Sequence, residues 1–180
     1  AQRGKDAELA KLQRMQPEPG QTSFTRQQVP LGLGHAVWCA RELVGDEPFA
    51  VLLADDLVMA ETPCLAQLID VFTQTGGNVV AVMDVPREHT DRYGILDVAA
   101  DDGTLAEIKG LVEKPAPKDA PSTLSIIGRY VLLPEIFAEL DRQERGAGNE
   151  IQLTDAMARR IGLIGMRSAS KVIQSSKRRI

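Results

Sequence analysis

The stretch FAVLLADD, residues 49–56, decides the fold of this chain. Its first five residues are all apolar, as expected for a strand that is buried on both faces of a parallel sheet. A helix with apolar residues at i, i+3, i+4 and i+7 follows; it starts at Thr62 and Pro63 and stops at Gly76. Residues 78–85 form a second apolar run. This succession of strand, helix and strand predicts an α/β sheet layered with helices.

The chain that follows this unit is richer in strands. Residues 93–98 and 105–112 flank the Asp-Asp-Gly sequence at 101–103, which is a turn signal between two strands. Residues 124–133 predict a further strand. The sequence therefore predicts a β-rich insertion within the α/β fold.

Local patterns predict three more elements. Apolar residues at helical spacing indicate a helix through residues 9–15, and residues 23–28 indicate a short strand. Gly34 opens another helix. Asn149, with Gln152 three residues further on, has the pattern of a capping box and predicts the start of a last helix.

The composition is that of a soluble globular protein, with 180 residues, 43% apolar and 26% charged, and the length fits one domain. No apolar run approaches the roughly 20 residues that a membrane helix needs, and no basic-then-apolar leader opens the sequence. We therefore expect no membrane partner and a cytoplasmic location. Cys39 and Cys64 fit neither a disulfide framework nor a zinc motif, so we expect both to be reduced and buried.

The charge is unevenly distributed. Residues 159–180 carry seven basic side chains and no acid, which leaves 14 basic and 25 acidic residues elsewhere, a net charge of −11 there. A basic tail can bind nucleic acid or anionic lipid. No aromatic residue interleaves these charges for base stacking, so the sequence favours a disordered end over a nucleic-acid partner.

Asp55 and Asp56 follow the first apolar strand, and Glu113 and Lys114 end a later one. Ligands of α/β sheets bind at the carboxyl ends of strands, so these residues predict a common pocket. Asp55 is a candidate ligand for Mg²⁺, a hard cation that shares carboxylates with phosphates. The alternative is a solvated acid or a helix cap. Asp56 is the weaker candidate.

The run LVEKP, residues 111–115, places a carboxylate beside an ammonium. Pro115 favours an extended backbone at Lys114, whose fixed charge suits a phosphate that gains charge during nucleotidyl transfer. Glu113 can accept hydrogen bonds from sugar hydroxyls. The alternatives are a surface lysine at a strand end and an exposed ion pair between the two, which contributes little stability.

The segment LGLGHA, residues 31–36, looks at first like a phosphate-binding turn at a helix start, but it lacks the spacing of a dinucleotide-binding or Walker motif. Its glycines allow close backbone approach to a flat ligand. His35 has no evident partner and is interpreted as structural, and Trp38 as packing on its helix. Gly94 fits a turn, or a backbone N–H offered to a sugar.

These segments together resemble the bacterial UTP–glucose-1-phosphate uridylyltransferases, also called UDP-glucose pyrophosphorylases. The resemblance extends from about Phe24 to Ala158. The matching stretches, in order, are FTRQQVPLGLGHAVWCA, VGDEPFAVLLADDLV, GGNVVAV, DRYGILDV, KGLVEKP, LSIIGRYVL and GNEIQLTDA. The resemblance implies a Rossmann-like mixed sheet with helices on both faces, of the nucleotide-diphospho-sugar transferase type.

The resemblance also implies a role for each site residue. Gln27 and the backbone of Gly32 would read the uracil, which replaces the phosphate interpretation of the glycine segment. Asp55 would hold Mg²⁺, Gly94 and Glu113 the glucose hydroxyls, and Lys114 the sugar phosphate. Glucose-1-phosphate would attack the α-phosphorus of UTP in line, releasing pyrophosphate and forming UDP-glucose. A homo-oligomer is also implied.

Departures from the family pattern lead to further expectations. We expect the sheet to lack the family's first strand and its Gly-rich, triphosphate-binding loop, and residues 159–180 to lack the family's second metal-binding aspartate. Ala54 stands where the family usually has proline. Residues 1–158 are then a partial catalytic domain, and 159–180 a basic tail from outside the family.

Two alternatives to an active enzyme follow from these departures. One is a catalytically inactive remnant that binds only sugar nucleotide or family subunits. The other is a nucleic-acid-binding module that depends on the basic tail, and the sequence favours it least.

Overall fold

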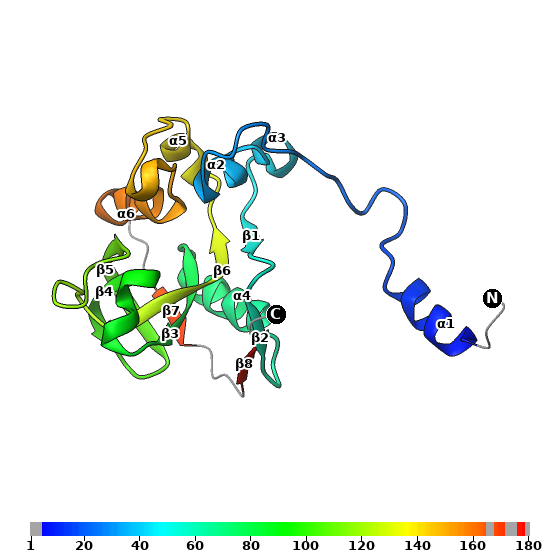
Figure 1. Cartoon of the computed structure of the whole chain (residues 1–180), viewed down its shortest axis with the longest axis horizontal. Helices are drawn as coiled ribbons and strands as arrows, with labels where there is room; N and C mark the ends of the chain where they lie inside the picture. The colour runs from blue at the N-terminus through cyan, green and yellow to red at the C-terminus, as the bar shows by residue number, and fades with distance from the viewer. Residues whose placement is uncertain (1–4, 165–167, 172–175, 179–180) are drawn as a thin grey trace.

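The computed structural model describes residues 5–164, 168–171 and 176–178 (Figure 1). Its main feature is a six-stranded mixed sheet. Only β3 and β7 are parallel neighbours in it, and the other neighbouring pairs are antiparallel. The strand order is β1 (Phe49–Leu52), β6 (Leu124–Leu132), β3 (Val79–Asp84), β7 (Ser168–Lys171), β5 (Leu105–Glu113) and β4 (Gly94–Asp101).

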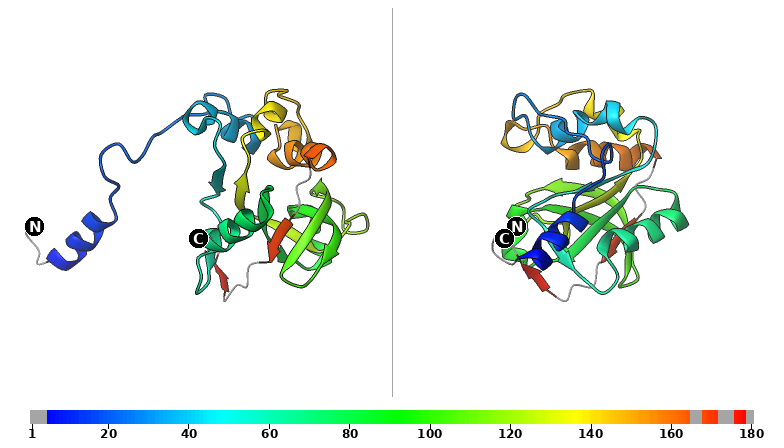
Figure 2. Two further views of the ribbon diagram at one scale, coloured as in Figure 1. Left: turned by 180° about the vertical axis from the view of Figure 1, so that it is seen from behind. Right: turned by 90° about the vertical axis from the view of Figure 1, so that its right-hand side faces the viewer.

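Helices cover both faces of this sheet, as predicted. The reason is visible in β3, where Val80 and Val82 belong to one hydrophobic core and Val79 and Ala81 to another. Alternate residues of a strand point to opposite faces, so the sheet separates the two cores. The larger core contains α2 (Leu33–Trp38), α5 (Ile136–Leu140) and α6 (Leu153–Ile164), and the smaller contains α4 (Cys64–Thr75); Figure 2 shows the two groups apart.

Strand β6 is the centre of the molecule. All nine of its residues are buried, and it borders β1 on one side and β3 on the other. Ser125 of β6 also pairs with Ile95 of β4, so the sheet curls back toward its centre. The residues of β6 alternate between the two cores, with Ile126 and Tyr130 in one and Ile127 and Val131 in the other.

The expectation of a fully buried parallel strand at residues 49–53 is wrong. β1 pairs antiparallel with β6, with Phe49 opposite Leu132, and its residues alternate between half-buried and exposed. No second strand pairs with β1 among the described residues. An apolar run reports the hydrophobicity of a strand, whereas its direction and neighbours are set by distant segments.

The first described segment extends away from the sheet. Helix α1 (Asp6–Arg14) forms where a helix is predicted, but none of its residues is buried (Figure 1). Residues 23–28 form no strand, and Phe24 is 93% exposed. The predicted strand at this position is therefore wrong, because β-propensity is not realised without a neighbouring strand or a surface on which to pack.

Helix ends follow local chemistry only in part. Helix α4 begins one residue later than predicted, with Pro63 as its N-cap residue, and ends at Gly76 in the left-handed conformation that glycine favours. The predicted capping box at Asn149 is wrong, because α6 begins only at Leu153. Asn149 instead belongs to the 3₁₀ turn η2 (Ala147–Asn149), and the Gln152 amide donates to the Ala147 carbonyl at 3.0 Å.

The hairpin of β4 and β5 forms around the predicted turn. The Asp101 carboxylate accepts from the Gly103 N–H at 2.8 Å, and the Asp102 carboxylate accepts from Thr104 and Leu105. These backbone bonds lower the pKa of the Asp102 carboxyl. The hairpin carries the end of β5 back to the start of β4, and the remaining short elements are α3 (Arg41–Val44), β2 (Leu57–Met59), β8 (Ser176–Arg178) and η1 (Arg87–Arg92).

Part of the basic tail belongs to a sheet. β7 lies between β3 and β5, and β8 pairs with β2, so these segments are not the disordered end favoured by the sequence. For residues 165–167, 172–175 and 179–180 that expectation lies outside the described residues.

Both cysteines are free thiols, as predicted. Cys64 is buried, and burial raises the pKa of its thiol, but Cys39 is only half-buried, which corrects the expectation for that residue. In the described part of the chain no helix combines the length and apolar character required to cross a bilayer.

Candidate functional site

A cavity of about 490 Å³ opens at the carboxyl end of β1. It brings together the loop after β1, the start of β4, the end of β5, part of β6 and the segment leading into α6. Its lining consists of Leu33, Leu53, Asp55, Asp56, Arg92, Tyr93, Gly94, Glu113, Lys114, Ile126, Gly128, Tyr130, Glu150, Gln152, Leu153 and Thr154. Asp55 and Lys114 therefore share one cavity, and the predicted common pocket is present.

The loop that carries Asp55 and Asp56 is held by β6. The Leu53 N–H donates to the Gly128 carbonyl at 2.9 Å, which extends the pairing of β1 and β6 by one bond. Arg129 is only 9% exposed, and its guanidinium donates to the carbonyls of Leu53 (2.7 Å), Gly128 (2.8 Å) and Asp56. The sequence reasoning missed Arg129, whose only signal was its place in the stretch LSIIGRYVL.

Glu113 lies at the end of β5, opposite Gly94 at the start of β4. Its side chain is 12% exposed. One oxygen, Oε2, accepts from the Thr154 hydroxyl at 2.9 Å, and the other, Oε1, is 3.5 Å from the Lys114 ammonium. The predicted pair with Lys114 exists, with the lysine 51% exposed and the glutamate nearly buried.

The backbone of Lys114 differs from the prediction. Its φ is 48°, in the left-handed region, rather than the extended geometry expected before Pro115. The Lys114 N–H donates to the Tyr93 carbonyl at 2.9 Å, so the residue stays attached to β4 while the chain turns away. This turn directs the chain out of the hairpin and leaves the side chain on the cavity wall.

Gln27 and Gly32 do not line the cavity. The Gln27 amide donates to the Gly32 carbonyl at 3.0 Å and to Nδ1 of His35 at 2.8 Å, so His35 has a partner that the sequence did not reveal. The segment is joined to the cavity edge through Ile151, which donates to the Leu31 carbonyl at 2.7 Å. Gly32 has a φ of 111° and sits so close to Ile151 and its neighbour Glu150 that a Cβ would clash.

Trp38 packs against the larger core, as predicted, and also makes polar contacts. Its indole N–H donates to the Asp141 carboxylate at 2.5 Å, its ring stacks on His35, and the Arg41 guanidinium lies 3.8 Å from the ring centroid. These contacts tie α2 to the end of α5, away from the cavity lining.

Acidic side chains outnumber basic side chains in the cavity lining. Tyr130, 3% exposed, contributes to the lining, and its pKa is raised far above the usual range, first by burial and then by Glu113, Asp56 and Asp55. Among the described residues no group of three or more His, Cys, Asp or Glu side chains could enclose a metal ion. The cavity lining does hold the carboxylate of Asp55, and carboxylate oxygens are ligands of the kind that Mg²⁺ prefers.

A mixed sheet with helices on both faces, and a cavity at strand ends that is lined by carboxylates and one lysine, defines an α/β protein with a polar, charged cavity. A family model described as nucleotidyl transferase matches residues 3–163. This chain belongs to the nucleotidyl transferase family.

Curated relatives narrow the comparison. The chain is 61% identical over 131 residues to a UTP–glucose-1-phosphate uridylyltransferase of Komagataeibacter xylinus, covering 73% of this chain and 46% of the relative. It is 56% identical over 134 residues to the protein of that name in Bacillus subtilis, with 74% and 46% covered. The resemblance predicted from the motifs is confirmed, and the chain spans about half the length of these relatives.

Solved structures of proteins with related names have a similar fold. A UDP-glucose pyrophosphorylase complexed with UDP-glucose matches with a TM-score of 0.82 and 37% identity, over 86% of this chain and 59% of that chain. A UTP-bound UGPase from Acinetobacter baumannii matches with a TM-score of 0.82 and 36% identity, over 95% and 59%. The fold class predicted from the sequence is therefore confirmed.

Proposed function

We propose that this chain carries the substrate-binding site of a UTP–glucose-1-phosphate uridylyltransferase, which forms UDP-glucose and pyrophosphate from UTP and glucose-1-phosphate. The observation that supports this proposal is the shared cavity of Asp55, Glu113 and Lys114. Identity above 50% to relatives of that name supports the substrates.

In this proposal each polar side chain has one task. Glu113, together with the backbone of Gly94, accepts and donates hydrogen bonds at the glucose hydroxyls. The Lys114 ammonium binds the phosphate of glucose-1-phosphate and directs its oxygen toward the α-phosphorus of UTP. Gln27 and the Gly32 backbone, which lie outside the cavity lining on the segment joined to its edge through Ile151, bind the uracil. Positioning and neutralisation of charge then accelerate the transfer without a covalent enzyme intermediate.

Asp55 is the proposed Mg²⁺ ligand. Bound Mg²⁺ supplies neutralisation of the charge on the phosphate oxygens. The turn after β1 fixes Asp55 at the cavity, because Arg129 and Gly128 bind the backbone on either side of it. The acidic lining supports a role for a cation between these carboxylates and a phosphorylated ligand.

We also propose a cytoplasmic homo-oligomer in which residues 1–158 are the catalytic part and residues 159–180 are a basic tail, of which residues 164–180 lie outside the family match. The two free thiols support a reducing compartment. The oligomer rests on the family resemblance.

The test of this function is pyrophosphate release by the 180-residue chain with UTP, glucose-1-phosphate and Mg²⁺. Lys114→Ala should lower turnover by roughly a hundredfold or more, since it removes a preorganised charge at the reacting phosphates. Lys118→Ala, which alters a lysine outside the cavity lining, is the matched control and should not change turnover.

If the chain shows no turnover, calorimetry with UDP-glucose distinguishes a chain that still binds the ligand from one that does not. Binding without turnover would support the inactive remnant. A Lys114→Ala chain that turns over at the wild-type rate would refute the role of that lysine.

A further inference from the structure

Thr154 connects α6 to the sugar end of the proposed site. It is the second residue of α6 and is 8% exposed. Its hydroxyl donates to Oε2 of Glu113 at 2.9 Å, across 41 residues of sequence. Its methyl carbon lies 3.0 Å from the position that a Cβ at Gly94 would occupy. Thr154 therefore touches both residues that are proposed to hold the glucose hydroxyls.

The hydrogen bond fixes the orientation of the Glu113 carboxylate. A carboxylate has about four lone-pair sites on two oxygens, and Thr154 occupies one of them. Oε1 faces Lys114 at the longer distance of 3.5 Å, and that lysine is half-exposed. The short bond to Thr154 is thus the firmer of the two contacts, and it leaves lone pairs on both oxygens for ligand hydroxyls.

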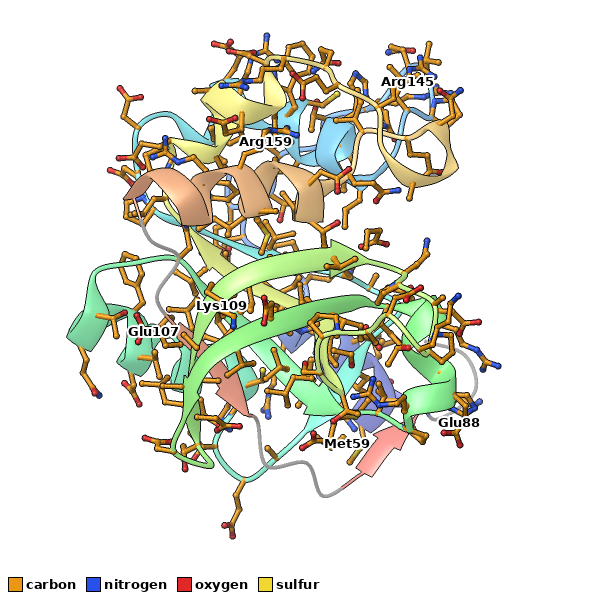
Figure 3. All side chains as sticks on the ribbon, turned by 90° about the vertical axis from the view of Figure 1, so that its left-hand side faces the viewer. Met59, Glu88, Glu107, Lys109, Arg145 and Arg159 are labelled. Carbon is orange, nitrogen blue, oxygen red and sulfur yellow. The ribbon has the colours of Figure 1, made fainter. Side chains whose placement is uncertain are left out.

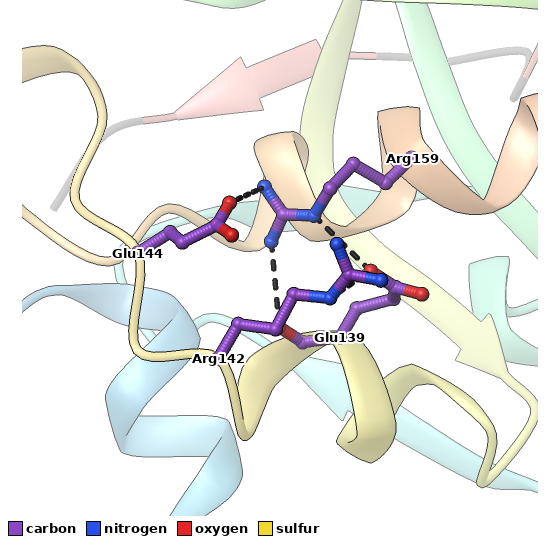
Figure 4. Close-up of polar contacts among 4 residues, drawn as sticks. All are labelled: Glu139, Arg142, Glu144 and Arg159. Carbon is purple, nitrogen blue, oxygen red and sulfur yellow. Dashed lines mark hydrogen bonds and ion pairs between the residues drawn. The ribbon is translucent and has the colours of Figure 1, made fainter.

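Helix α6 is a rigid support for this hydroxyl. Three of its own residues are fully buried in the larger core, namely Leu153, Ala156 and Met157. Further along the helix, Arg159 binds Glu139 of α5 at 3.2 Å and Glu144 at 3.3 Å (Figure 4). A hydroxyl on a well-anchored helix holds its partner with little freedom, as a preorganised binding site requires.

We propose that Thr154 is a positioning residue that orients Glu113 for the hydroxyls of the hexosyl group, and so sets the affinity for the sugar part of the ligand. This inference rests on the function proposed above. Thr154 contributes through Glu113 and Gly94, and the nucleotide part of the ligand does not depend on it.

Thr154→Val tests this proposal, because valine has nearly the shape of threonine and carries a methyl group in place of the hydroxyl. Calorimetry should show that UDP-glucose binds about tenfold more weakly, the scale of one lost charge-assisted hydrogen bond, while UDP binds as to the wild type. Thr154→Ser keeps the hydroxyl and should restore most of the affinity for UDP-glucose. A general structural defect would instead weaken the binding of both UDP-glucose and UDP, and would contradict the proposal.

Two controls sharpen the result. Thr123→Val removes a threonine–carboxylate bond to Asp84 outside the cavity lining and should leave both affinities unchanged. In a Glu113→Gln background, Thr154→Val should have much less effect, since coupled residues are not additive. Should Thr154→Val unfold, Thr154→Ala and Thr154→Ser, which differ by one hydroxyl, give the same comparison.

The outcomes that contradict the proposal are distinct. Unchanged UDP-glucose affinity in Thr154→Val, with the wild type preferring UDP-glucose to UDP, overturns the role of Thr154 and leaves the function standing. A wild-type chain that binds UDP-glucose no better than UDP overturns the proposed function, and this inference with it.

Discussion

At the residue scale, Lys114 of the candidate site has a backbone conformation that residues with a Cβ atom do not favour. Lys114 has a φ of 48°, and a left-handed residue with a Cβ costs roughly 1–2 kcal/mol. The bond from its N–H to the Tyr93 carbonyl and the pairing of Gly94 with Glu113 hold it there. Such strain persists where the surrounding structure fixes it, and here it fixes an ammonium on the cavity wall.

This strain predicts a separation of stability from function at one residue. The free energy of unfolding should be up to about 1 kcal/mol larger for Lys114→Gly than for Lys114→Ala, because only glycine adopts this φ without cost. The glycine variant is therefore expected to be the more stable one. Both variants lack the ammonium and should lose turnover equally. Urea unfolding monitored by circular dichroism measures the difference.

The control lies on the same strand. Val112 of β5 pairs with Ile95 in an unbroken part of the hairpin and lies outside the cavity lining, so Val112→Gly should be less stable than Val112→Ala. If alanine were the more stabilising substitution at both positions, residue 114 would not be left-handed in solution.

At the element scale, α5 and α6 are joined by an ionic cluster around one buried carboxylate, that of Glu139. Glu139 of α5, whose side chain is 5% exposed, binds Arg142 at 3.2 Å and Arg159 of α6 at 3.2 Å, and Arg159 also binds Glu144 (Figure 4). Arg159 lies between the two helices (Figure 3). A nearly buried carboxylate that loses one partner retains an uncompensated desolvation cost.

Arg159→Met should therefore lower the free energy of unfolding by roughly 2–3 kcal/mol, less than for a fully isolated buried charge because Arg142 remains. Lys109→Met is the matched control, since Lys109 pairs with Asp97 at the exposed surface, where such a pair contributes less than about 1 kcal/mol. Chemical denaturation compares the two. An equal small loss in both variants would mean that the cluster adds nothing to the docking of α6.

The elements also show how far sequence patterns reach. A turn signal predicted the hairpin around 101–103, helical spacing predicted α4 and an apolar stretch predicted β6, because these patterns are local. It failed for residues 23–28 and for the direction of β1, because strand pairing depends on segments far apart in the sequence. Element types were thus predictable where the deciding contacts are near in sequence.

At the scale of the whole molecule, the charged residues of the candidate site could be predicted from the sequence. The residues that hold them in place could not. Asp55 and Lys114 follow strands, so a rule about strand ends places both in one cavity. Arg129 and Thr154 act on groups 73 and 41 residues away, and nothing in their local sequence names those targets. Only the folded chain shows which carbonyls and which carboxylate they bind.

The burial of β6 also has a consequence for amide hydrogen exchange. An amide in a strand that is buried along its whole length and bordered on both sides exchanges mainly through global opening. In deuterium oxide, peptides covering β6 should take up label last, and those covering α1 should be labelled within the first time point. Mass spectrometry of the digested protein would read this order directly, and early labelling of β6 would place the slowest-opening unit elsewhere. If β6 is labelled last, the loop that carries Asp55 should also stay in place until global opening, because Gly128 and Arg129 of β6 bind its backbone.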